Sequence, residues 1–296
     1  MRRRGLLRSL VPSPAYPLLL PGMAWLALFF LLPMWYLAKM SLRQGNLQQG
    51  FTLTFHWSTY SDAVATYHTQ FLRSVTYAGV ATLLAFAISY PLAYVIAFRA
   101  GRYRNLLLLL VIAPFFTSYL IRTLAWETIL SDRSVVTTTL DHVGLLDVMS
   151  GLGWTTGGRL LATPAAVVAG ITYNYLPFMA LPLYVSLGKI DRRLLEAALD
   201  LYANRLRAFL RVTLPLSLPG ILAGTLLTFV PALGDYVNAQ LLGSADTTMI
   251  GNVIQSKFLV FSDYPAAAAL SFLIMAAILV FVVAYGRLLG TEELSG

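Results

Sequence analysis

Apolar residues form long blocks along this chain, and short polar and basic segments separate the blocks. A membrane-spanning helix needs about 20 mostly apolar residues, and six blocks reach that length. They lie at about 17–40, 71–98, 106–126, 164–188, 216–235 and 265–286. The short alternation of apolar and polar residues that marks the strands of a membrane barrel is not found. The pattern therefore predicts an all-α integral membrane protein with six transmembrane helices.

The first apolar block follows a basic start, MRRRGLLRSL, which resembles the charged region of a signal peptide. Its apolar run spans about Leu18 to Met40, longer than the 7–15 residues of a signal core, and no small-residue cleavage site follows. We therefore expect an uncleaved first span.

Composition and charge give the orientation. Of all residues 58% are hydrophobic and 11% are charged, against roughly 25% charged in soluble domains. The N-terminal segment, 99–105, 189–215 and the C-terminal segment hold most of the 21 lysines and arginines, but fewer than half of the 13 acids. The positive-inside rule places these segments, and so both termini, in the cytoplasm. The net charge of +8 then reflects topology, and no basic soluble domain indicates nucleic-acid binding.

Several kinds of chemistry are excluded. The chain has no cysteine, and its three histidines have no ligand-like spacing, so we expect no metal site and no catalytic residues. A phosphate-binding loop is also missing, because Gly188-Lys189 is followed by Ile190 instead of serine or threonine. If the protein uses ATP, another chain hydrolyses it, and we expect no cofactor in this one.

Three longer segments are predicted outside, at 41–70, 127–163 and 236–264. The second is long enough for a short helix and a glycine-rich turn region. The third contains MIGNVIQSKFLVF, whose apolar residues recur at helical spacing and predict an interfacial or cavity-capping helix.

The cytoplasmic segment 190–215 predicts two short helices joined by a turn. Asp191 suits the N-cap of the first helix, and Asn204 can cap the second. One face of the first helix is apolar; its residues are Leu194, Leu195, Ala198, Leu201 and Tyr202. Such a segment can dock a partner protein, or it can lie on the inner leaflet as a basic amphipathic loop.

The same segment resembles a known motif. Glu196-Ala197-Ala198, followed by Val212-x-Leu214-Pro215, is similar in spacing to the EAA motif of ATP-binding-cassette (ABC) importer permeases. The resemblance implies a type I ABC importer permease fold, in which the first helix is a coupling helix that docks on a separate ATPase. It also implies which residues contact that ATPase. They are Glu196, Ala197, Ala198, Asp200, Leu201 and Tyr202.

Two positions depart from that motif. Tyr202 stands where the family has glycine, and Val212 stands where it has isoleucine. Glycine would allow a left-handed turn that tyrosine resists. Either the turn moves to Ala203-Asn204, or Tyr202 is an aromatic anchor for the ATPase.

Other segments resemble the spermidine/putrescine (polyamine) branch of these permeases. They are 71–99, 113–126 (APFFTSYLIRTLAW), 230–243 (VPALGDYVNAQLLG) and 250–259. The resemblance implies a multi-pass protein of the bacterial inner membrane that forms half of a polyamine pathway. It implies as partners a second homologous permease, two ATPase subunits that hold ATP and magnesium, and an extracytoplasmic polyamine-binding protein. The alternatives are a permease for another small solute, an ion-coupled secondary transporter, or a membrane subunit without a pathway.

A polyamine pathway needs carboxylates and aromatic faces, and ionisable residues at membrane depth tend to mark pathways. Three sequence clusters meet this need; they are Asp235-Tyr236, Tyr173-Asn174-Tyr175 and Trp126-Glu127. Each has a plainer interpretation, which is an interfacial capping pair for the first, helix packing for the second and a membrane-interface anchor for Trp126. Arg122, near Glu127, is expected to extend outward or to bond a loop.

Gly220 and Gly224 form a small-xxx-small pattern that predicts close helix packing. No linker interrupts the chain, so we expect residues 1–296 to form one transmembrane domain. It consists of a first span and outer loop at about 17–70, and a permease core at 71–286 that includes the coupling segment 190–215.

Overall fold

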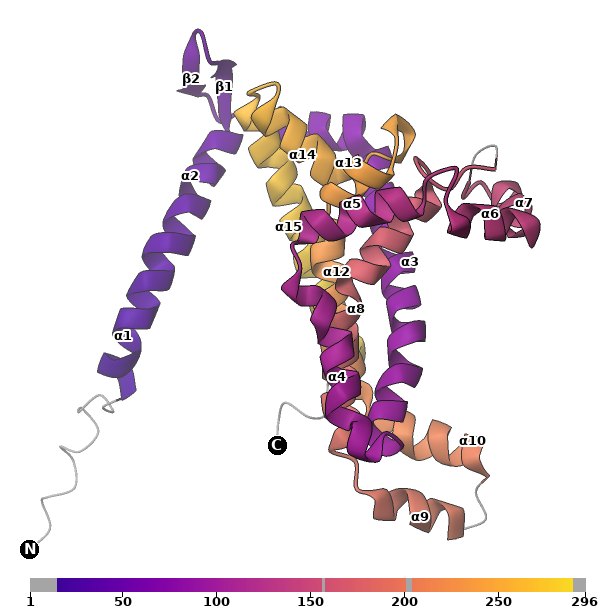
Figure 1. Ribbon diagram of the computed structural model, residues 1–296. Helices are drawn as coiled ribbons and strands as arrows, with labels where there is room; N and C mark the ends of the chain where they lie inside the picture. The colour runs from indigo at the N-terminus through magenta and orange to yellow at the C-terminus, as the bar shows by residue number, and fades with distance from the viewer. Residues whose placement is uncertain (1–14, 156–157, 201–203, 290–296) are drawn as a thin grey trace, which may run out of the picture.

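The computed structural model describes residues 15–155, 158–200 and 204–289, and these are mainly helical (Figure 1). Within these ranges four helices are long and apolar enough to cross a membrane, and there are up to six spans if each of two bent helix pairs counts as one. The predicted all-α membrane fold with six spans is confirmed at this level.

The first span lies apart from the other helices in Figure 1. It consists of α1 (Ala15–Leu26), the π-helical turn η1 (Ala27–Leu31) and α2 (Leu32–Ser41). None of its apolar window is buried inside the described chain, and α2 contacts α15. This span therefore offers nearly its whole surface to lipid or to another chain.

A small hairpin that the sequence pattern did not predict follows the first span. Its strands β1 (Arg43–Asn46) and β2 (Gly50–Leu53) pair antiparallel. The Oδ1 atom of Asn46 accepts hydrogen bonds from the backbone N–H groups of Gln48 (3.1 Å) and Gln49 (2.8 Å), which closes the turn. The hairpin stands at the end of the molecule that also carries α13 and α14 (Figure 1). We call it the outer end, because the charge distribution assigns it to the outside.

Three helices pack together as the centre of the bundle: α3 (Ser58–Phe98), α8 (Pro164–Gly188) and α12 (Leu218–Leu233). Helix α8 has the predicted bounds, because Thr163 caps its first turn and Pro164 suits that position. Helix α3 starts at Ser58, before the predicted residue 71, but it is kinked at Tyr67, where the backbone is not helical (φ −112°, ψ 15°). The part after the kink corresponds to the predicted span. On the side of α3 that faces the core, small residues allow close approach of its neighbours; they are Ala78, Ala81 and Ala85, each 0% exposed.

The third span is not the single helix expected at 106–126. After η2 (Gly101–Tyr103), α4 (Arg104–Ile112) and the 3₁₀ turn η3 (Ala113–Phe116), the chain is extended at Thr117 and Ser118. It resumes as α5 (Tyr119–Ile129), bent by 95° from the preceding helix. Hydropathy did not reveal the break, because the residues on both sides of it are apolar. The break turns α5 across the bundle (Figure 1).

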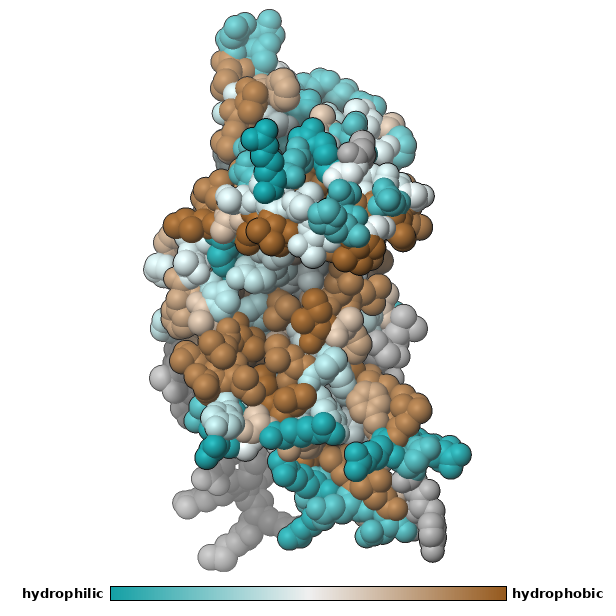
Figure 2. Space-filling view, turned by 45° about the vertical axis from the view of Figure 1, so that its right-hand side comes forward, coloured by the Kyte–Doolittle hydropathy of each residue, from teal (hydrophilic) through white to brown (hydrophobic). Residues whose placement is uncertain are grey.

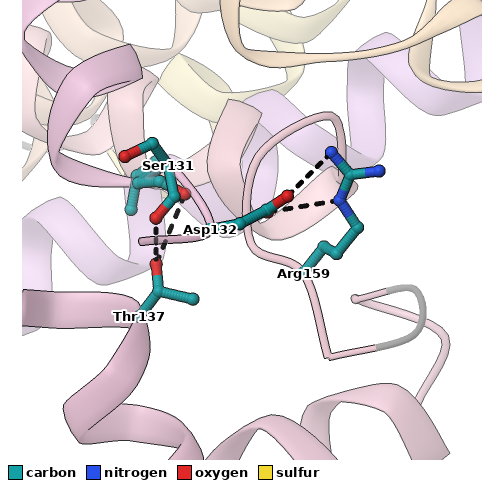
Figure 3. Close-up of polar contacts among 5 residues, drawn as sticks. Ser131, Asp132, Thr137 and Arg159 are labelled. Atoms are coloured by element: carbon teal, nitrogen blue, oxygen red, sulfur yellow. Dashed lines mark hydrogen bonds and ion pairs between the residues drawn. The ribbon is translucent and has the colours of Figure 1, made fainter. Parts of the chain in front are cut away.

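The predicted outer segment 127–163 contains two short helices, α6 (Val135–His142) and α7 (Leu145–Gly151). Ser134 caps α6 by accepting the backbone N–H of Thr137 at 3.1 Å. The Thr137 hydroxyl in turn donates to the Ser131 carbonyl at 2.9 Å. Nearby, the Arg159 guanidinium pairs with the Asp132 carboxylate at 2.9 Å (Figure 3). The Arg159–Asp132 pair ties the segment after α7 back to the end of α5.

The opposite end carries the arginine-rich elements, and we call it the basic end. They are α9 (Arg192–Asp200), α10 (Arg205–Ala208), the π-helical turn η4 (Phe209–Thr213) and α11 (Leu214–Leu216). The helix over Arg205–Leu216 meets α12 at an angle of 62°, a change of direction that Pro215 and Pro219 favour.

The last part of the chain returns to the outer end and then spans the bundle again. It consists of α13 (Val237–Leu242), η5 (Ala245–Thr247), α14 (Ile250–Leu259) and α15 (Tyr264–Leu289). Lys257 on α14 pairs with Asp263 before α15 at 2.9 Å, and this hydrogen bond raises the pKa of the lysine. Seen from one side, apolar side chains cover the middle of the molecule and hydrophilic ones gather at both ends (Figure 2), as a bilayer requires.

Candidate functional site

Asp235 lies in the turn between α12 and α13 and is only 5% exposed. Its Oδ1 atom accepts the backbone N–H of Asn238 in the first turn of α13 at 3.1 Å, although the N-cap residue of this helix is Tyr236. Its Oδ2 atom accepts the Asn238 side-chain amide at 2.7 Å and the Tyr119 hydroxyl at 2.5 Å. One carboxylate oxygen therefore binds the start of α13, as a capping role would require, but Asp235 is buried and its other oxygen binds two side chains.

Further buried polar groups extend from Asp235 toward α5 and α8. The Asn238 amide also donates to the Tyr119 hydroxyl at 2.6 Å. The Asn174 amide on α8 donates to Asn238 Oδ1 at 3.1 Å and to the Thr123 hydroxyl at 3.2 Å. Tyr119 is partly buried, and the other three are at most 1% exposed. We call these residues the polar cluster: Tyr119, Thr123, Asn174, Asp235 and Asn238.

Aromatic rings adjoin the polar cluster and form what we call the aromatic wall, made of Phe115, Tyr119, Tyr175 and Phe178. The ring centroids of Tyr119 and Tyr175 lie 6.3 Å apart, those of Tyr175 and Phe178 lie 6.1 Å apart, and those of Phe178 and Phe115 lie 5.1 Å apart. Tyr119 belongs to both sets, since its ring is part of the wall and its hydroxyl binds Asp235.

Arg122, one turn after Tyr119 on α5, lies against this wall. Its guanidinium carbon is 5.6 Å from the centre of the Phe115 ring and 5.8 Å from that of the Tyr119 ring. The side chain is only 8% exposed. The expectation that Arg122 extends outward is therefore wrong, because the bend before α5 points this face of the helix into the protein.

The structure brings together only part of the residues that the sequence indicated. Asp235 and Asn174 lie in the polar cluster, and Tyr175 lies in the wall. Tyr173 packs on Trp126 of α5, with ring centroids 5.4 Å apart. Tyr236 is 42% exposed, and Glu127 is half-buried near Trp126 in the chain.

Other members of the site were not indicated by the sequence; they are Phe115, Tyr119, Thr123, Phe178 and Asn238. Asn238 follows Asp235 by three residues, the spacing of a helix cap and its partner, which is a usable signal. Tyr119 and Thr123 are separated by one helical turn of α5, but only the bend at residues 117 and 118 points both toward Asp235.

The arrangement suits recognition of a cation. A buried carboxylate favours a positive partner, and aromatic faces attract ammonium and guanidinium groups. In the described part of the chain, no group of three histidine, cysteine or acidic side chains could hold a metal ion.

The second predicted site lies on α9 at the basic end. Asp191 accepts the backbone N–H of Arg193 at 3.0 Å and Asn204 accepts that of Arg207 at 2.8 Å, so both predicted caps are present. Side chains of the predicted contact set are exposed at Glu196, Ala197 and Asp200 and half-buried at Ala198. Leu201 and Tyr202 lie outside the described residues, and so does the turn that replaces the motif glycine.

The two glycines of α12 lie against α8. A Cβ atom on Gly220 would come within 2.5 Å of the Ser186 Cβ atom, and one on Gly224 would come within 2.8 Å of the Met179 sulfur. Both glycines are buried. The close contact between α12 and α8 is therefore possible only because glycine has no side chain at these two positions.

Comparison with known proteins agrees with this architecture. The family described as "Binding-protein-dependent transport system inner membrane component" matches residues 89–289. The PotB spermidine/putrescine permease proteins of Haemophilus influenzae and Escherichia coli are 38% and 36% identical to this chain, each over 264 residues. The alignments cover 88% and 89% of this chain, and 89% and 93% of the two proteins.

Solved structures share the fold. A chain of a bacterial ABC transporter for the acidic polysaccharide alginate superposes with a TM-score of 0.65 at 20% identity, over 94% of this chain and 96% of that chain. A chain of the MetNI methionine ABC transporter superposes with a TM-score of 0.52 at 16% identity, over 75% and 93%. With this fold and these relatives, the chain belongs to the family of binding-protein-dependent transport system inner membrane components, the permease subunits of ABC importers.

Proposed function

We propose that this permease forms half of the translocation pathway for spermidine and putrescine. The observation that carries the proposal is the buried Asp235 carboxylate beside the aromatic wall. Spermidine and putrescine are flexible chains with protonated amines. The carboxylate would bind one ammonium group, and the wall would hold the chain through cation–π and apolar contacts. The names of the relatives at 36–38% identity support the same substrate class.

A second group in the polar cluster suits an amine. The Oδ1 atom of Asn174 is buried and accepts no hydrogen bond within the described residues. An ammonium group carries only donors, so it can satisfy this acceptor and the Asp235 carboxylate together. A neutral solute would leave the buried negative charge of Asp235 without a positive partner, and an anionic solute would be repelled by it.

We also propose how the pathway is powered. The exposed face of α9 would dock on one of two ATPase subunits, which hold ATP and magnesium. A second permease and an extracytoplasmic binding protein would complete the importer in a bacterial inner membrane. Closure of the ATPases would pull α9, and α12 would follow through Leu214-Pro215. The chain, acting as one transmembrane domain, would then alternate between states that differ in affinity for the substrate.

The test is uptake of labelled spermidine into vesicles that contain the whole complex, with the Asp235→Asn variant. Asparagine keeps an oxygen that can accept the backbone N–H of Asn238 but removes the charge. Hydrogen bonds to charged groups contribute about 1.5–3 kcal/mol, so we expect uptake at limiting spermidine to fall by about tenfold or more.

Asp246→Asn is the matched control, since Asp246 is an exposed acid at the outer end and should transport like the unchanged protein. Equal uptake by the two variants would remove Asp235 from the pathway. If the unchanged complex carries another small cationic solute but no spermidine, the permease role stands and the substrate is corrected. Uptake driven by an ion gradient without ATP would contradict the proposed energy source.

A further inference from the structure

Arg122 is a buried cation without a hydrogen-bond acceptor for two of its nitrogens. Its Nε and Nη1 atoms are buried and have no partner in the described ranges. Neither ion pair found among those residues includes it. Other arginines donate to backbone carbonyls, as Arg73 does to Thr248 at 3.0 Å and Arg192 to Phe98 at 3.1 Å. An arginine stays protonated in proteins, so its charge is present in the site at all times.

The contacts that Arg122 does make are those of an ammonium ligand. Its guanidinium lies 5.6 and 5.8 Å from the centres of the Phe115 and Tyr119 rings, within the range in which cations bind aromatic faces. These two rings belong to the aromatic wall. The hydroxyl of the same Tyr119 donates to Asp235 at 2.5 Å. One tyrosine therefore joins the resident cation to the carboxylate.

We propose that Arg122 is a placeholder cation that occupies the aromatic wall of the empty pathway and makes the site select against singly charged cations. A monovalent cation can make only one of the two contacts: on the wall it has to displace the guanidinium and leaves Asp235 without an ammonium group, and at Asp235 it leaves the wall occupied by Arg122. A substrate with two or more ammonium groups can displace the guanidinium with one group and still bind Asp235 with another. Linking two contacts in one molecule makes the second contact intramolecular and favours it strongly.

This inference rests on the proposed cationic substrate, but it makes a separate prediction. Removing the guanidinium should open the wall to single amines. In Arg122→Gln and Arg122→Met, a singly charged amine meets no resident competitor. A desolvated cation–π contact corresponds to about a tenfold change in affinity or more, so we expect butylamine to bind at least about tenfold more tightly than in the unchanged protein. Arg122→Lys keeps a cation and should continue to exclude it.

Equilibrium dialysis of labelled butylamine and labelled spermidine against the complete permease–ATPase complex in lipid nanodiscs tests this. The binding protein is left out, so that its own selectivity does not contribute. Arg133→Gln is the matched control, because Arg133 is exposed in the outer segment after α5, and we expect it to exclude butylamine as the unchanged protein does.

The outcomes separate the two proposals. Tight butylamine binding by Arg122→Gln and Arg122→Met, with exclusion retained in Arg122→Lys and Arg133→Gln, supports the placeholder. Unchanged butylamine affinity in all four variants would overturn it. If neither Arg122→Gln nor Arg122→Met assembles into the complex, the arginine is needed for folding, and this result would also overturn the proposal. If the unchanged complex neither binds nor transports spermidine, the proposed substrate fails, whatever the Arg122 variants do with butylamine.

Discussion

Tyr119 connects the two opposite charges of the site. Its hydroxyl accepts from the Asn238 amide at 2.6 Å and donates to Asp235 at 2.5 Å, and its ring faces the Arg122 guanidinium. The hydroxyl holds the carboxylate in one position, while the ring lowers the cost of a buried cation. The residue thus acts through two chemically separate parts, and these parts can be tested separately.

Replacing Tyr119 with phenylalanine keeps the ring and removes the hydroxyl. The buried Asp235 and Asn238 groups then lose a partner, which costs about 1–3 kcal/mol. We expect spermidine uptake to fall several-fold and the complex to unfold at a lower temperature. Uptake assays and thermal unfolding of the purified complex measure both effects.

Tyr236→Phe is the control, since Tyr236 is next to Asp235 in sequence but is 42% exposed. It should behave like the unchanged protein. If the two substitutions reduced uptake equally, the hydrogen bond from Tyr119 would have no special part in the site.

The sequence indicated Asp235, Asn174 and Tyr175 because charged or amide groups are costly inside apolar segments and therefore noticeable. It did not indicate Tyr119, which lies 116 positions from Asp235 in the chain. A tyrosine inside a predicted span such as 106–126 is ordinary by itself. Its importance comes only from the bend that brings it to the carboxylate, and single-sequence patterns do not encode such distant contacts.

At the scale of elements, hydropathy located the spans well where one helix crosses the bundle and failed where a helix is broken. Helix α8 matches its prediction because Thr163 and Pro164 mark its start. The third span was predicted as one helix although its two parts meet at 95°. Both sides of the break are mostly apolar, and Pro114 was a local signal. The site depends on this break, because α5 carries Tyr119, Arg122 and Thr123.

The contact between α12 and α8 gives a prediction at the same scale. In Gly220→Ala the new Cβ atom would lie within 2.5 Å of the Ser186 Cβ atom and 2.8 Å of the Pro182 carbonyl oxygen. The helices must move apart, and such overpacking costs about 1–3 kcal/mol. We expect a lower free energy of unfolding in a denaturant titration of the purified protein.

Gly79→Ala on α3 is the matched control, because its Cβ atom would meet nothing within 4 Å. Alanine in a helix is favoured over glycine by about 0.5–1 kcal/mol, so this variant should be unchanged or slightly more stable. Equal stability of the two variants would mean that α12 and α8 are not held at close distance.

At the scale of the whole molecule, two surfaces are left uncovered by the described chain itself. The first span has no buried apolar window within the described chain. At the basic end, α9 exposes Glu196, Ala197 and Asp200. Charge counting assigned this end to the cytoplasm, and the motif resemblance proposed an ATPase there. Figure 1 shows α9 and α13 at opposite ends of the bundle. The helices that connect these two ends and pack on one another are α3, α8 and α12, and Arg192 of α9 donates to the Phe98 carbonyl at the end of α3.

Reversal of one charge on α9 tests this docking surface. Glu196 is exposed at its middle, and in Glu196→Arg a positive side chain would face a surface that is proposed to fit a negative one. Like charges brought together at an interface cost several kcal/mol, so we expect the ATPase subunits to bind at least about tenfold more weakly. Co-purification of the ATPase and spermidine-stimulated ATP hydrolysis measure the loss.

Asp246→Arg makes the same charge reversal on an exposed acid at the outer end and should leave both readouts intact. If Glu196→Arg and Asp246→Arg both retain the ATPase and its stimulation by spermidine, the docking proposal fails. The plainer interpretation would then hold, in which this basic, amphipathic segment lies on the inner leaflet.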